Sequence, residues 1–347
     1  MPESSQNPGV PLRAAIVGMG NWGQRLVRSV KGHDGAIRFV AGATRTPERA
    51  RAFAEEHGIA MRARYEDVLA DPDIEAVVLA TPHSMHTEQI LAAARAKKHV
   101  FTEKPLGLTA ADSEAAARAC AEHGVTLGVG YNWRFQPALQ EIKRMLEDGR
   151  LGRLLHIEGN FNGPSAYRFP KGHWRHDRDE APAGGMTGRG VHVIDAMLFL
   201  AGHIDSVTAQ SFRLAQDFGI DDTTSMLLRF KSGATGYLGT FIATAEGWRM
   251  QIFGSKGWVE VGDVEHLTTW EMRVCFVDPA EPLKRNRPET VTFPATSTER
   301  AELEAFARAA RAGKPLALPG GDAVHNVAAL EAILKSAGEN GRLVPVG

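Results

Sequence analysis

The chain has 347 residues, of which 43% are hydrophobic and 23% are charged, so it can bury the cores of two ordinary domains and is neither disordered nor fibrous. Its 40 Lys and Arg residues are balanced by 41 Asp and Glu residues, which leaves no basic excess for binding nucleic acid or an anionic membrane surface. Nowhere does an apolar run approach the length of a membrane span.

Residues 1–10 lack the positive charge and the apolar stretch of a secretory signal, and we expect them to form a short disordered tail. The two cysteines, Cys120 and Cys275, are too few and too far apart in sequence for a disulfide framework. We therefore expect a protein of the reducing cytoplasm.

From Leu12 onward, short apolar runs alternate with helical patterns. Predicted strands cover residues 12–18, 37–44, 76–81, 99–103 and 126–130. Predicted helices cover residues 21–30, a segment capped by Thr46 and begun by Pro47, a segment that ends at Lys97, and residues 109–123. Strands and helices that alternate in this way form a parallel sheet covered by helices. The sequence therefore predicts a doubly wound α/β Rossmann domain over residues 11–130.

After Gly149 the pattern changes to a series of strand-like runs. They cover residues 154–161, 206–212, 223–230, 234–241, 249–253 and 257–261. Amphipathic helices follow at 298–312 and 322–337, and we expect both to pack back on one of the domains. Residues 131–347 are thus predicted to form an α+β domain with a large, mostly antiparallel open sheet.

The glycine-rich run Gly18-Met19-Gly20-Asn21-Trp22-Gly23 joins the first predicted strand to the first predicted helix. In this context the first glycine allows a tight turn, the second lets the backbone approach a pyrophosphate, and the third allows close packing of helix on strand. Backbone amides at the start of the helix then face the phosphates. A purely structural glycine turn is the alternative, and the surrounding α/β pattern favours dinucleotide binding.

The end of the second predicted strand bears on which dinucleotide binds. Enzymes that use NAD commonly carry an acidic residue there, about twenty residues past the glycine run, for the ribose 2′-hydroxyl. This chain has Ala43-Thr44-Arg45-Thr46 instead, and Thr44 and Arg45 can donate hydrogen bonds and positive charge to a 2′-phosphate. We predict NADP in preference to NAD, with a solvent-facing Arg45 as the alternative.

A polar segment, Thr81-Pro82-His83-Ser84-Met85-His86, follows the predicted strand at 76–81, at a carboxyl edge where open α/β sheets bind ligands. The spacing of His83 and His86, and that of His173 and His176, raises the question of a metal site. Neither pair has the further ligands expected at recognisable spacing. We predict no metal, and instead capping, contacts with the cofactor or plain surface histidines.

Two further segments carry candidate catalytic groups. Glu103-Lys104-Pro105 ends the predicted strand at 99–103, and Lys104 is the best candidate because its ammonium can hydrogen-bond a substrate oxygen as hydride leaves. A surface ion pair is the alternative for Lys104. Further on, a glycine-rich stretch leads into an apolar helix with His192 and Asp195 on one face. Such a pair is more often a packed histidine with a hydrogen-bonded carboxylate than a catalytic group.

Taken together, these motifs resemble the Gfo/Idh/MocA family, named for glucose-fructose oxidoreductase, inositol dehydrogenase and a rhizopine-catabolism protein. The resemblance spans nearly the whole chain. The motifs that carry it are Gly18-x-Gly20-x-x-Gly23, Thr81-Pro82 with His86, Glu103-Lys104-Pro105, Gly130-Tyr131-Asn132-Trp133-Arg134-Phe135 with Pro137, Trp174-Arg175, and Gly190-x-His192-x-x-Asp195.

The resemblance implies a Rossmann domain followed by an open, largely antiparallel sheet that covers the active site and commonly forms a homodimer or homotetramer interface. It implies that Lys104 lies near nicotinamide and substrate and that His192 serves as acid or base. The predicted cofactor contacts are Gly18, Met19, Gly20, Asn21, Trp22, Gly23, Thr44, Arg45, Thr81, Pro82, His86, Glu103, Lys104 and Asn132. The residues predicted to line the substrate side are Tyr131, Arg134, Trp174, Arg175 and Asp195.

One position departs from the family pattern. Many dehydrogenases of the family carry an aspartate four residues before the histidine that matches His192, where this chain has Gly188. Without that carboxylate, nothing at this position can hydrogen-bond a substrate hydroxyl or polarise the imidazole, so the substrate class or the proton route must differ. Asp177, Asp179 and Asp195 are the candidates for compensation.

The leading hypothesis is an NAD(P)-dependent oxidoreductase that transfers hydride between nicotinamide and a carbinol carbon of a sugar, cyclitol or related polyhydroxylated small molecule. Lys104 and His192 would manage the proton. A redox-neutral enzyme that recycles a tightly bound cofactor, such as an epimerase or an eliminating glycosidase, is the first alternative. A non-catalytic NADPH-binding sensor is the second.

Overall fold

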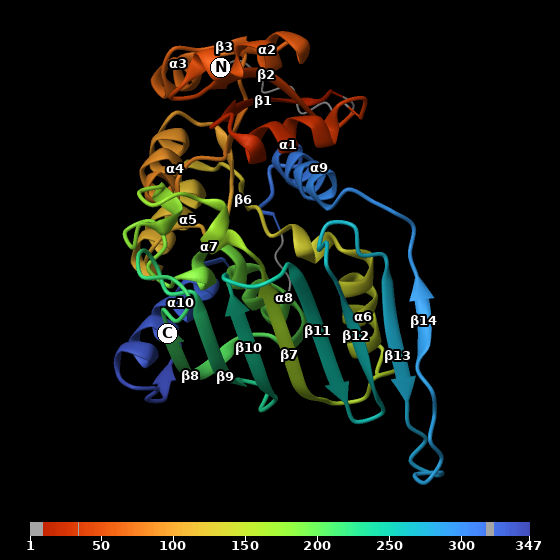
Figure 1. The fold of residues 1–347 in the computed structure, drawn as a ribbon. Helices are drawn as coiled ribbons and strands as arrows, with labels where there is room; N and C mark the ends of the chain where they lie inside the picture. The colour runs from red at the N-terminus through yellow and green to blue at the C-terminus, as the bar shows by residue number, and fades with distance from the viewer. Residues whose placement is uncertain (1–9, 34, 317–322) are drawn as a thin grey trace. The chain divides into compact units, whose positions relative to one another are not determined.

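The computed structural model describes residues 10–33, 35–316 and 323–347, which form two compact units (Figure 1). Unit 1 consists of Met1–Asn132 and Ser297–Ala317, and unit 2 of Trp133–Thr296 and Leu318–Gly347. Of the tail expected at residues 1–10, all but Val10 lies outside the described residues. Among the helices of the described ranges, none combines the length and the apolar character needed to cross a bilayer.

Unit 1 is built on a six-stranded sheet in which all neighbouring strands run parallel. The strand order is β3-β2-β1-β4-β5-β6, so the chain moves outward from β1 in one direction and from β4 in the other. This is the doubly wound order, and the predicted class of this unit is confirmed. The strands are β1 (Leu12–Val17), β2 (Ile37–Ala43), β3 (Ala60–Met61), β4 (Ala76–Leu79), β5 (His99–Thr102) and β6 (Leu127–Val129).

Two helices of unit 1 begin at residues that the sequence marks as caps. Thr46 and Pro47 begin a helix as predicted, although the Thr46 side chain makes no capping hydrogen bond. The Thr109 hydroxyl accepts the amide of Asp112 at the start of another, which ends at Gly124 with a φ of 68°. The helices are α1 (Asn21–Val30), α2 (Pro47–Glu56), α3 (Tyr65–Ala70), α4 (His86–Arg95), α5 (Ala110–His123) and α9 (Thr298–Arg311).

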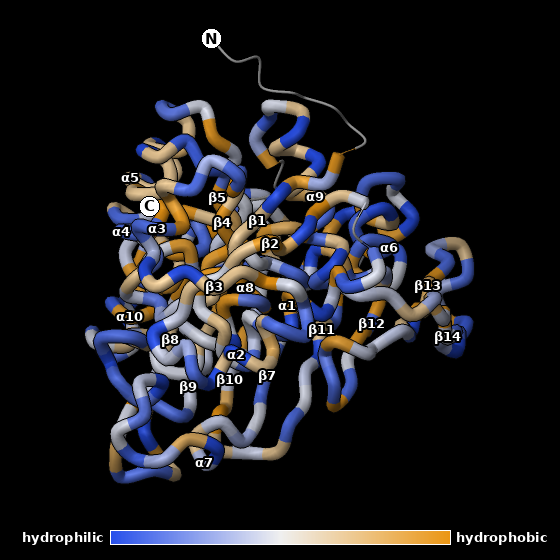
Figure 2. Tube along the Cα trace, turned by 90° about the horizontal axis from the view of Figure 1, so that it is seen from above, coloured by the Kyte–Doolittle hydropathy of each residue, from blue (hydrophilic) through white to orange (hydrophobic). Residues whose placement is uncertain are grey.

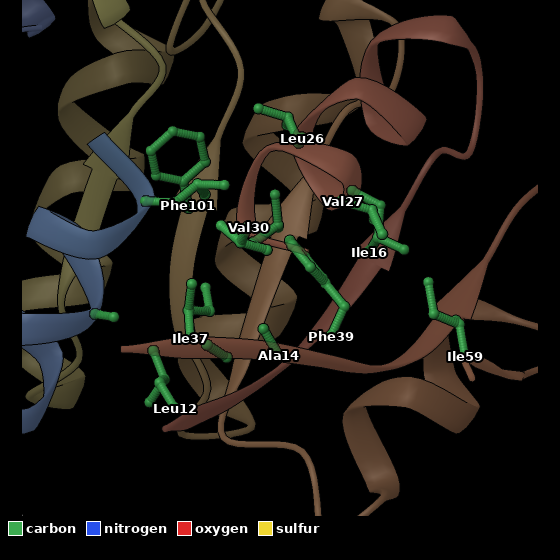
Figure 3. Close-up of a cluster of buried hydrophobic side chains, with 14 of the residues drawn as sticks. Leu12, Ala14, Ile16, Leu26, Val27, Val30, Ile37, Phe39, Ile59 and Phe101 are labelled. Atoms are coloured by element: carbon green, nitrogen blue, oxygen red, sulfur yellow. The ribbon is translucent and has the colours of Figure 1, made fainter. Parts of the chain in front are cut away.

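The core of unit 1 lies between its sheet and helices α1 and α9. Leu26, Val27 and Val30 of α1 lie over β1 and β2 (Figure 3). On the side of α9, the rings of Phe101 and Phe306 meet edge to face at 5.6 Å. Hydrophobic residues gather along β1, β4 and β5 (Figure 2), because strands covered by helices on both faces are apolar throughout. A segment far along the chain therefore completes this core.

Unit 2 contains a nine-stranded sheet of order β14-β13-β12-β11-β7-β10-β9-β8-β15. Its neighbours pair antiparallel except β7 and β10, which run parallel. The large, mostly antiparallel open sheet is thus confirmed. The strands are β7 (Leu154–Asn162), β8 (Ile204–Phe212), β9 (Thr223–Phe230), β10 (Thr235–Phe241), β11 (Gly247–Gly254), β12 (Gly257–Asp263), β13 (Glu271–Phe276), β14 (Glu289–Thr292) and β15 (Val344–Pro345).

The two faces of this sheet differ in burial. Along β7 and β11 buried residues alternate with partly exposed ones, as period-two strands with one covered face require. Helices α8 and α10 contact the sheet at β7 and β8, and α6 packs on α8. The helices of unit 2 are α6 (Pro137–Glu147), α7 (Ser165–Arg168), α8 (Val191–Ala201) and α10 (Ala323–Gly338).

Candidate functional site

The three glycines of the glycine run meet three different surroundings. Gly18 has a φ of 91°, and a Cβ atom there would collide with the carbonyl oxygen of Ala80 after β4. A Cβ atom on Gly23 would collide with the carbonyl oxygen of Gly18, whereas one on Gly20 would meet nothing within 4 Å. The first and third glycines are therefore required by the protein's own packing, and the second leaves open space of the kind a pyrophosphate needs.

Helix α1 begins directly after this open position. Gly20 is its N-cap residue and its first turn carries no acidic side chain, so the free amides and the positive end of the helix dipole favour an anion there. Gly20 and Asn21 are exposed, while Met19 is buried in the core against Gly42. Met19 can thus contribute only its backbone to a ligand, and the run as a whole fits a dinucleotide phosphate.

At the end of β2, the described chain offers no carboxylate from Ala43 to Thr46. Thr44 is partly buried and Arg45 is exposed. Among the ion pairs of the described residues, none involves Arg45, so its guanidinium is available to a phosphate.

His86 joins the two turns that follow β4 and β5. Its ring is fully buried, with Nδ1 2.8 Å from the carbonyl oxygen of Pro105 and Nε2 3.1 Å from that of Thr81. The Thr81 hydroxyl also donates to the side-chain oxygen of Gln89 at 2.6 Å. The two contacts of His86 thus bring Thr81-Pro82 and Lys104-Pro105 together at one edge of the sheet. Lys104 is partly buried and lies between the end of β5 and Pro105.

The Glu103 carboxylate connects this edge to the glycine run. Trp22 donates its indole N–H to Glu103 Oε1 at 2.5 Å, and Gly130 lies against the same carboxylate, because a Cβ atom there would be 2.9 Å from Oε1. Burial raises the pKa of Glu103 to about 7, although the Lys104 charge and the Trp22 hydrogen bond act in the opposite direction. The sequence predicts both residues as cofactor contacts; their direct contact is a finding of the structure.

Helix α9 supplies groups that the sequence analysis missed. The Arg25 guanidinium of α1 pairs with the buried Glu299, whose carboxylate also accepts from the Thr298 hydroxyl at 3.2 Å. The Asn132 amide donates to the same Thr298 hydroxyl at 3.1 Å. Asn132 Oδ1 is buried and, among the described residues, has no hydrogen-bond partner, which makes it an acceptor left for a ligand. Nothing in the local sequence could have indicated this meeting of distant segments.

In unit 2, Arg134 and Asp195 bind each other. Arg134 Nε and Nη2 donate to the two carboxylate oxygens at 2.7 and 2.6 Å, and both side chains are buried. Burial raises the pKa of the Asp195 carboxyl, and the guanidinium partly offsets that rise. The pair ties the short helical turn Asn132–Phe135, which precedes α6, to α8. Asp195 thus holds a guanidinium, and its contribution in place of a carboxylate at Gly188 stays a prediction.

His192 lies in an aromatic cluster. Its ring stacks on Trp133 with centroids 5.6 Å apart and lies 6.1 Å from Phe161 and 6.2 Å from His266. The Trp133 indole donates to His266 Nδ1 at 2.9 Å. Phe161 and His266 were not predicted as site residues, because they come from β7 and from the loop after β12, at unrelated positions of the chain.

Gly188 lies in a wide helical turn, Met186–Gly190, that leads into α8. A Cβ atom on Gly188 would meet nothing within 4 Å, so the fold leaves space for a side chain that the sequence does not provide. Asp177 and Asp179 are exposed, and the Asp177 carboxylate caps the amide of Asp179 at 2.9 Å.

The remaining predicted substrate residues have different surroundings. The Arg175 guanidinium stacks over the Trp174 ring at 4.4 Å, on a segment between α7 and α8. Tyr131 belongs to unit 1 and is buried. The structure therefore groups the predicted residues into a set in unit 1, around the glycine run and Glu103-Lys104, and a set in unit 2, around His192.

The two histidine pairs do not converge with further ligands. His83 and His86 have ring centroids 6.0 Å apart, and His176 Nε2 faces the carbonyl oxygen of Phe169 at 3.0 Å. Within residues 10–33, 35–316 and 323–347, no three His, Cys, Asp or Glu side chains gather as a metal ion requires.

Comparison with known families gives two matches, one following the other along the chain. The family described as "Oxidoreductase family, NAD-binding Rossmann fold" matches residues 12–131. The family described as "GFO/IDH/MocA C-terminal domain" matches residues 139–260.

Individual proteins match over most of their length. The chain is 31% identical to D-xylose 1-dehydrogenase (NADP(+)) 2 of Haloferax volcanii, over 86% of this chain and 89% of that protein. It is 29% identical to inositol 2-dehydrogenase of Rhizobium meliloti, over 94% and 97%. The crystal structure of aldose-aldose oxidoreductase from Caulobacter crescentus, complexed with glycerol, matches with a TM-score of 0.86 and 27% identity over 96% of this chain and 99% of that one.

Proposed function

The chain belongs to the Gfo/Idh/MocA family of NAD-binding oxidoreductases, and from this membership we propose that it transfers hydride to or from a carbinol carbon of a sugar or cyclitol. The observation that carries the proposal is the glycine run, whose packing fits a dinucleotide at each of its three glycines. Relatives named as xylose and inositol dehydrogenases support the substrate class. In this proposal residues 11–130 hold the dinucleotide and residues 131–347 the substrate.

The bound nicotinamide would supply or accept the hydride. Lys104 donates a hydrogen bond to the reacting oxygen and stabilises its developing negative charge. His192 takes the hydroxyl proton during oxidation and returns it during reduction. His86 acts through the backbone, since its contacts with the carbonyl oxygens of Thr81 and Pro105 keep the Lys104 turn in place.

The role of Lys104 can be tested by substitution. Lys104→Ala should lower the turnover of an oxidisable polyol by about a hundredfold or more, because a positioned acid–base group contributes that much. NADPH affinity, measured by fluorescence titration, should change little. Lys31→Ala is the control, since Lys31 is an exposed lysine of the same unit paired with Glu56 at 3.3 Å. Unchanged turnover of Lys104→Ala would sink the assignment.

We propose NADP as the preferred cofactor, because Thr44 and the unpaired guanidinium of Arg45 stand where a carboxylate would select NAD. Arg45→Ala should weaken NADPH binding by about tenfold, the loss of one charge-assisted contact, and leave NADH binding unchanged. Arg38→Ala, an exposed arginine of β2, is the matched control. Equal effects of Arg45→Ala on both cofactors would contradict the preference for NADP.

A redox-neutral reaction is the second candidate, and Gly188 favours it because the usual carboxylate is missing there. The name of the aldose-aldose oxidoreductase describes a reaction between two aldoses. Under this reading the purified protein would retain its dinucleotide and convert substrate with no net change in nicotinamide absorbance. Stoichiometric reduction of added NADP would exclude it.

We also propose a cytoplasmic homodimer or homotetramer formed through the nine-stranded sheet. Its partly exposed face carries cross-strand ion pairs, Arg249 with Glu158 at 2.7 Å and Arg273 with Glu260 at 3.0 Å, a polar pattern suited to contact with an identical face. Light scattering coupled to gel filtration measures the state directly. A monomer at micromolar concentration would contradict this part of the proposal.

A further inference from the structure

Arg189 follows the position where many relatives have an aspartate, and it reverses the charge expected there. Gly188 offers no side chain, and the next residue places a guanidinium beside the aromatic cluster of His192. The Arg189 side chain is only 13% exposed. A partly buried cation next to a position that lacks the family's anion points to a substrate that differs in charge from a neutral sugar.

The structure holds this guanidinium on several sides. Arg189 Nη1 donates to the carbonyl oxygen of Asn162 at 2.7 Å and to Glu246 Oε1 at 2.6 Å. Its central carbon lies 4.6 Å from the centre of the Phe161 ring. A Cβ atom on Gly163 would be 2.5 Å from Nη2, so only glycine lets the guanidinium lie so close to this backbone. Arg189 is thus fixed before any ligand arrives, which lowers the entropic cost of binding one.

The local charge remains positive despite the ion pair. Glu246 is shared, because the Arg168 guanidinium also donates to its Oε2 at 3.3 Å. Two guanidinium groups therefore face one carboxylate. Within the described residues both hydrogen bonds of Arg189 come from Nη1, which leaves Nε and Nη2 as donors for a further acceptor. A planar guanidinium with two donors to spare is suited to the oxygens of a carboxylate or phosphate.

Arg189 also lies close to the proposed acid–base residue. The Phe161 ring, against which the Arg189 guanidinium packs, has its centre 6.1 Å from that of the His192 ring. Arg189 lies in the wide helical turn Met186–Gly190, and His192 is the second residue of α8, which follows that turn directly. A Cβ atom on Gly188, the residue before Arg189, would meet nothing within 4 Å, so there is open space at this position.

We propose that Arg189 binds an oxyanion carried by the substrate, so that the enzyme acts on sugar acids or sugar phosphates in preference to neutral sugars. This inference rests on the proposed function, because it names the substrate class of the same site. If the Arg189 guanidinium served only to bind Glu246 and Asn162, the enzyme would bind acidic and neutral sugars with equal affinity.

The test is calorimetric titration of the full chain, saturated with NADP, using D-gluconate, D-glucose 6-phosphate and D-glucose. We expect one of the two anions to bind at least about tenfold more tightly than glucose, the advantage of a charge-assisted contact. The tighter of the two identifies carboxylate or phosphate as the recognised group. Equal affinity for all three compounds would overturn the proposal.

Variants separate recognition from structure. Arg189→Gln should abolish the anion preference without weakening the binding of glucose, and Arg189→Lys should retain part of it. Glu246→Gln removes the competing carboxylate and should strengthen the preference, while Gly188→Asp places a negative charge in the open space and should weaken it. A preference that survives Arg189→Gln in a protein with a native circular dichroism spectrum would contradict the proposal.

If Arg189→Gln does not fold, the Glu246→Gln and Gly188→Asp variants decide, and an anion preference unchanged in both would overturn the inference. The binding assay also separates this inference from the proposed function. No reduction of NADP with any polyol, acidic or neutral, would contradict hydride transfer, whereas anion binding that depends on Arg189 would still stand.

Discussion

At the scale of single residues, Glu103 is the most unusual group of unit 1. Its carboxyl group is buried, accepts the Trp22 indole and has a pKa of about 7. Such a group is only partly ionised at neutral pH, so small changes around it alter its charge. Because Glu103 contacts Trp22 of the glycine run and directly precedes Lys104, its charge state bears on both.

A pH dependence follows from this shift. The folded pKa of about 7 exceeds the ordinary value of 4.5, so the folded state binds this proton more tightly than the unfolded state does. The resulting contribution to the free energy of unfolding is fully present below pH 4.5 and is lost as the pH rises through 7. Glu103→Gln keeps an acceptor for the indole and cannot ionise. Relative to the wild type, its free energy of unfolding should rise by up to about 3 kcal/mol between pH 4.5 and pH 8. Urea unfolding of both proteins at both pH values measures this change. A difference in unfolding free energy between variant and wild type that stays constant with pH would refute the raised pKa.

The sequence predicts a single residue well where only one residue type fits its position. It predicts poorly which distant residues contact each other. Gly18 and Gly23 could be predicted because only glycine permits their backbone contacts. The contacts of Trp22 with Glu103 and of Arg134 with Asp195 could not, since each joins elements whose relative placement depends on the fold. The predicted roles of Lys104 and His192 stay predictions.

At the scale of elements, different glycines of the glycine run serve the fold and the ligand: Gly23 is required by packing, whereas Gly20 leaves space for a ligand. Gly23→Ala should destabilise the protein by about 1–3 kcal/mol, because its Cβ atom collides with backbone. Gly20→Ala, with open space and an extended backbone (φ −73°, ψ −172°), should change stability by less than about 0.5 kcal/mol.

Gly20→Ala should instead weaken NADPH binding, by about tenfold or more, because the added methyl group occupies the place of the pyrophosphate. Chemical unfolding and a fluorescence titration give the two readouts. The assignment fails if Gly20→Ala binds NADPH like the wild type while Gly23→Ala folds like it.

Several elements with strong patterns were predicted closely, whereas some weakly patterned elements and one strongly patterned helix were missed. The helix at Asn21–Val30 and the strand at Thr223–Phe230 have the predicted bounds. Edge strand β14 is short and mostly exposed, and β13 beside it is only six residues long. The predicted elements omitted both strands. Helix α6 was missed although Leu139, Ile142 and Met145 are spaced for a buried face.

At the scale of the whole molecule, neither unit is a continuous stretch of chain. Unit 1 takes Ser297–Ala317 from beyond the body of unit 2. Phe306 of this segment lies in the core with Leu303, and Arg311 holds Glu75 at 2.7 Å. The sequence predicts that both C-terminal helices pack back on one of the domains, but not that α9 joins unit 1 while α10 joins unit 2, because that choice depends on long-range packing.

Removing the anchor of this segment tests its contribution. Phe306→Ala should cost about 3–5 kcal/mol of unfolding free energy, as for other buried aromatic residues. Arg308→Ala, exposed on the same helix, should cost less than about 0.5 kcal/mol. Denaturant melts compare the two, and similar losses would show that α9 contributes little to the core.

The returning segment also has a consequence for biosynthesis. Ribosomes add about 5–20 residues per second, so the strands of unit 1 emerge on the order of ten seconds before α9 does. Throughout that interval the side of Phe101 that Phe306 later covers is exposed to solvent. Nascent chains stalled between β14 and α9 should therefore bind chaperones that recognise apolar surface, and chains released after α9 should not.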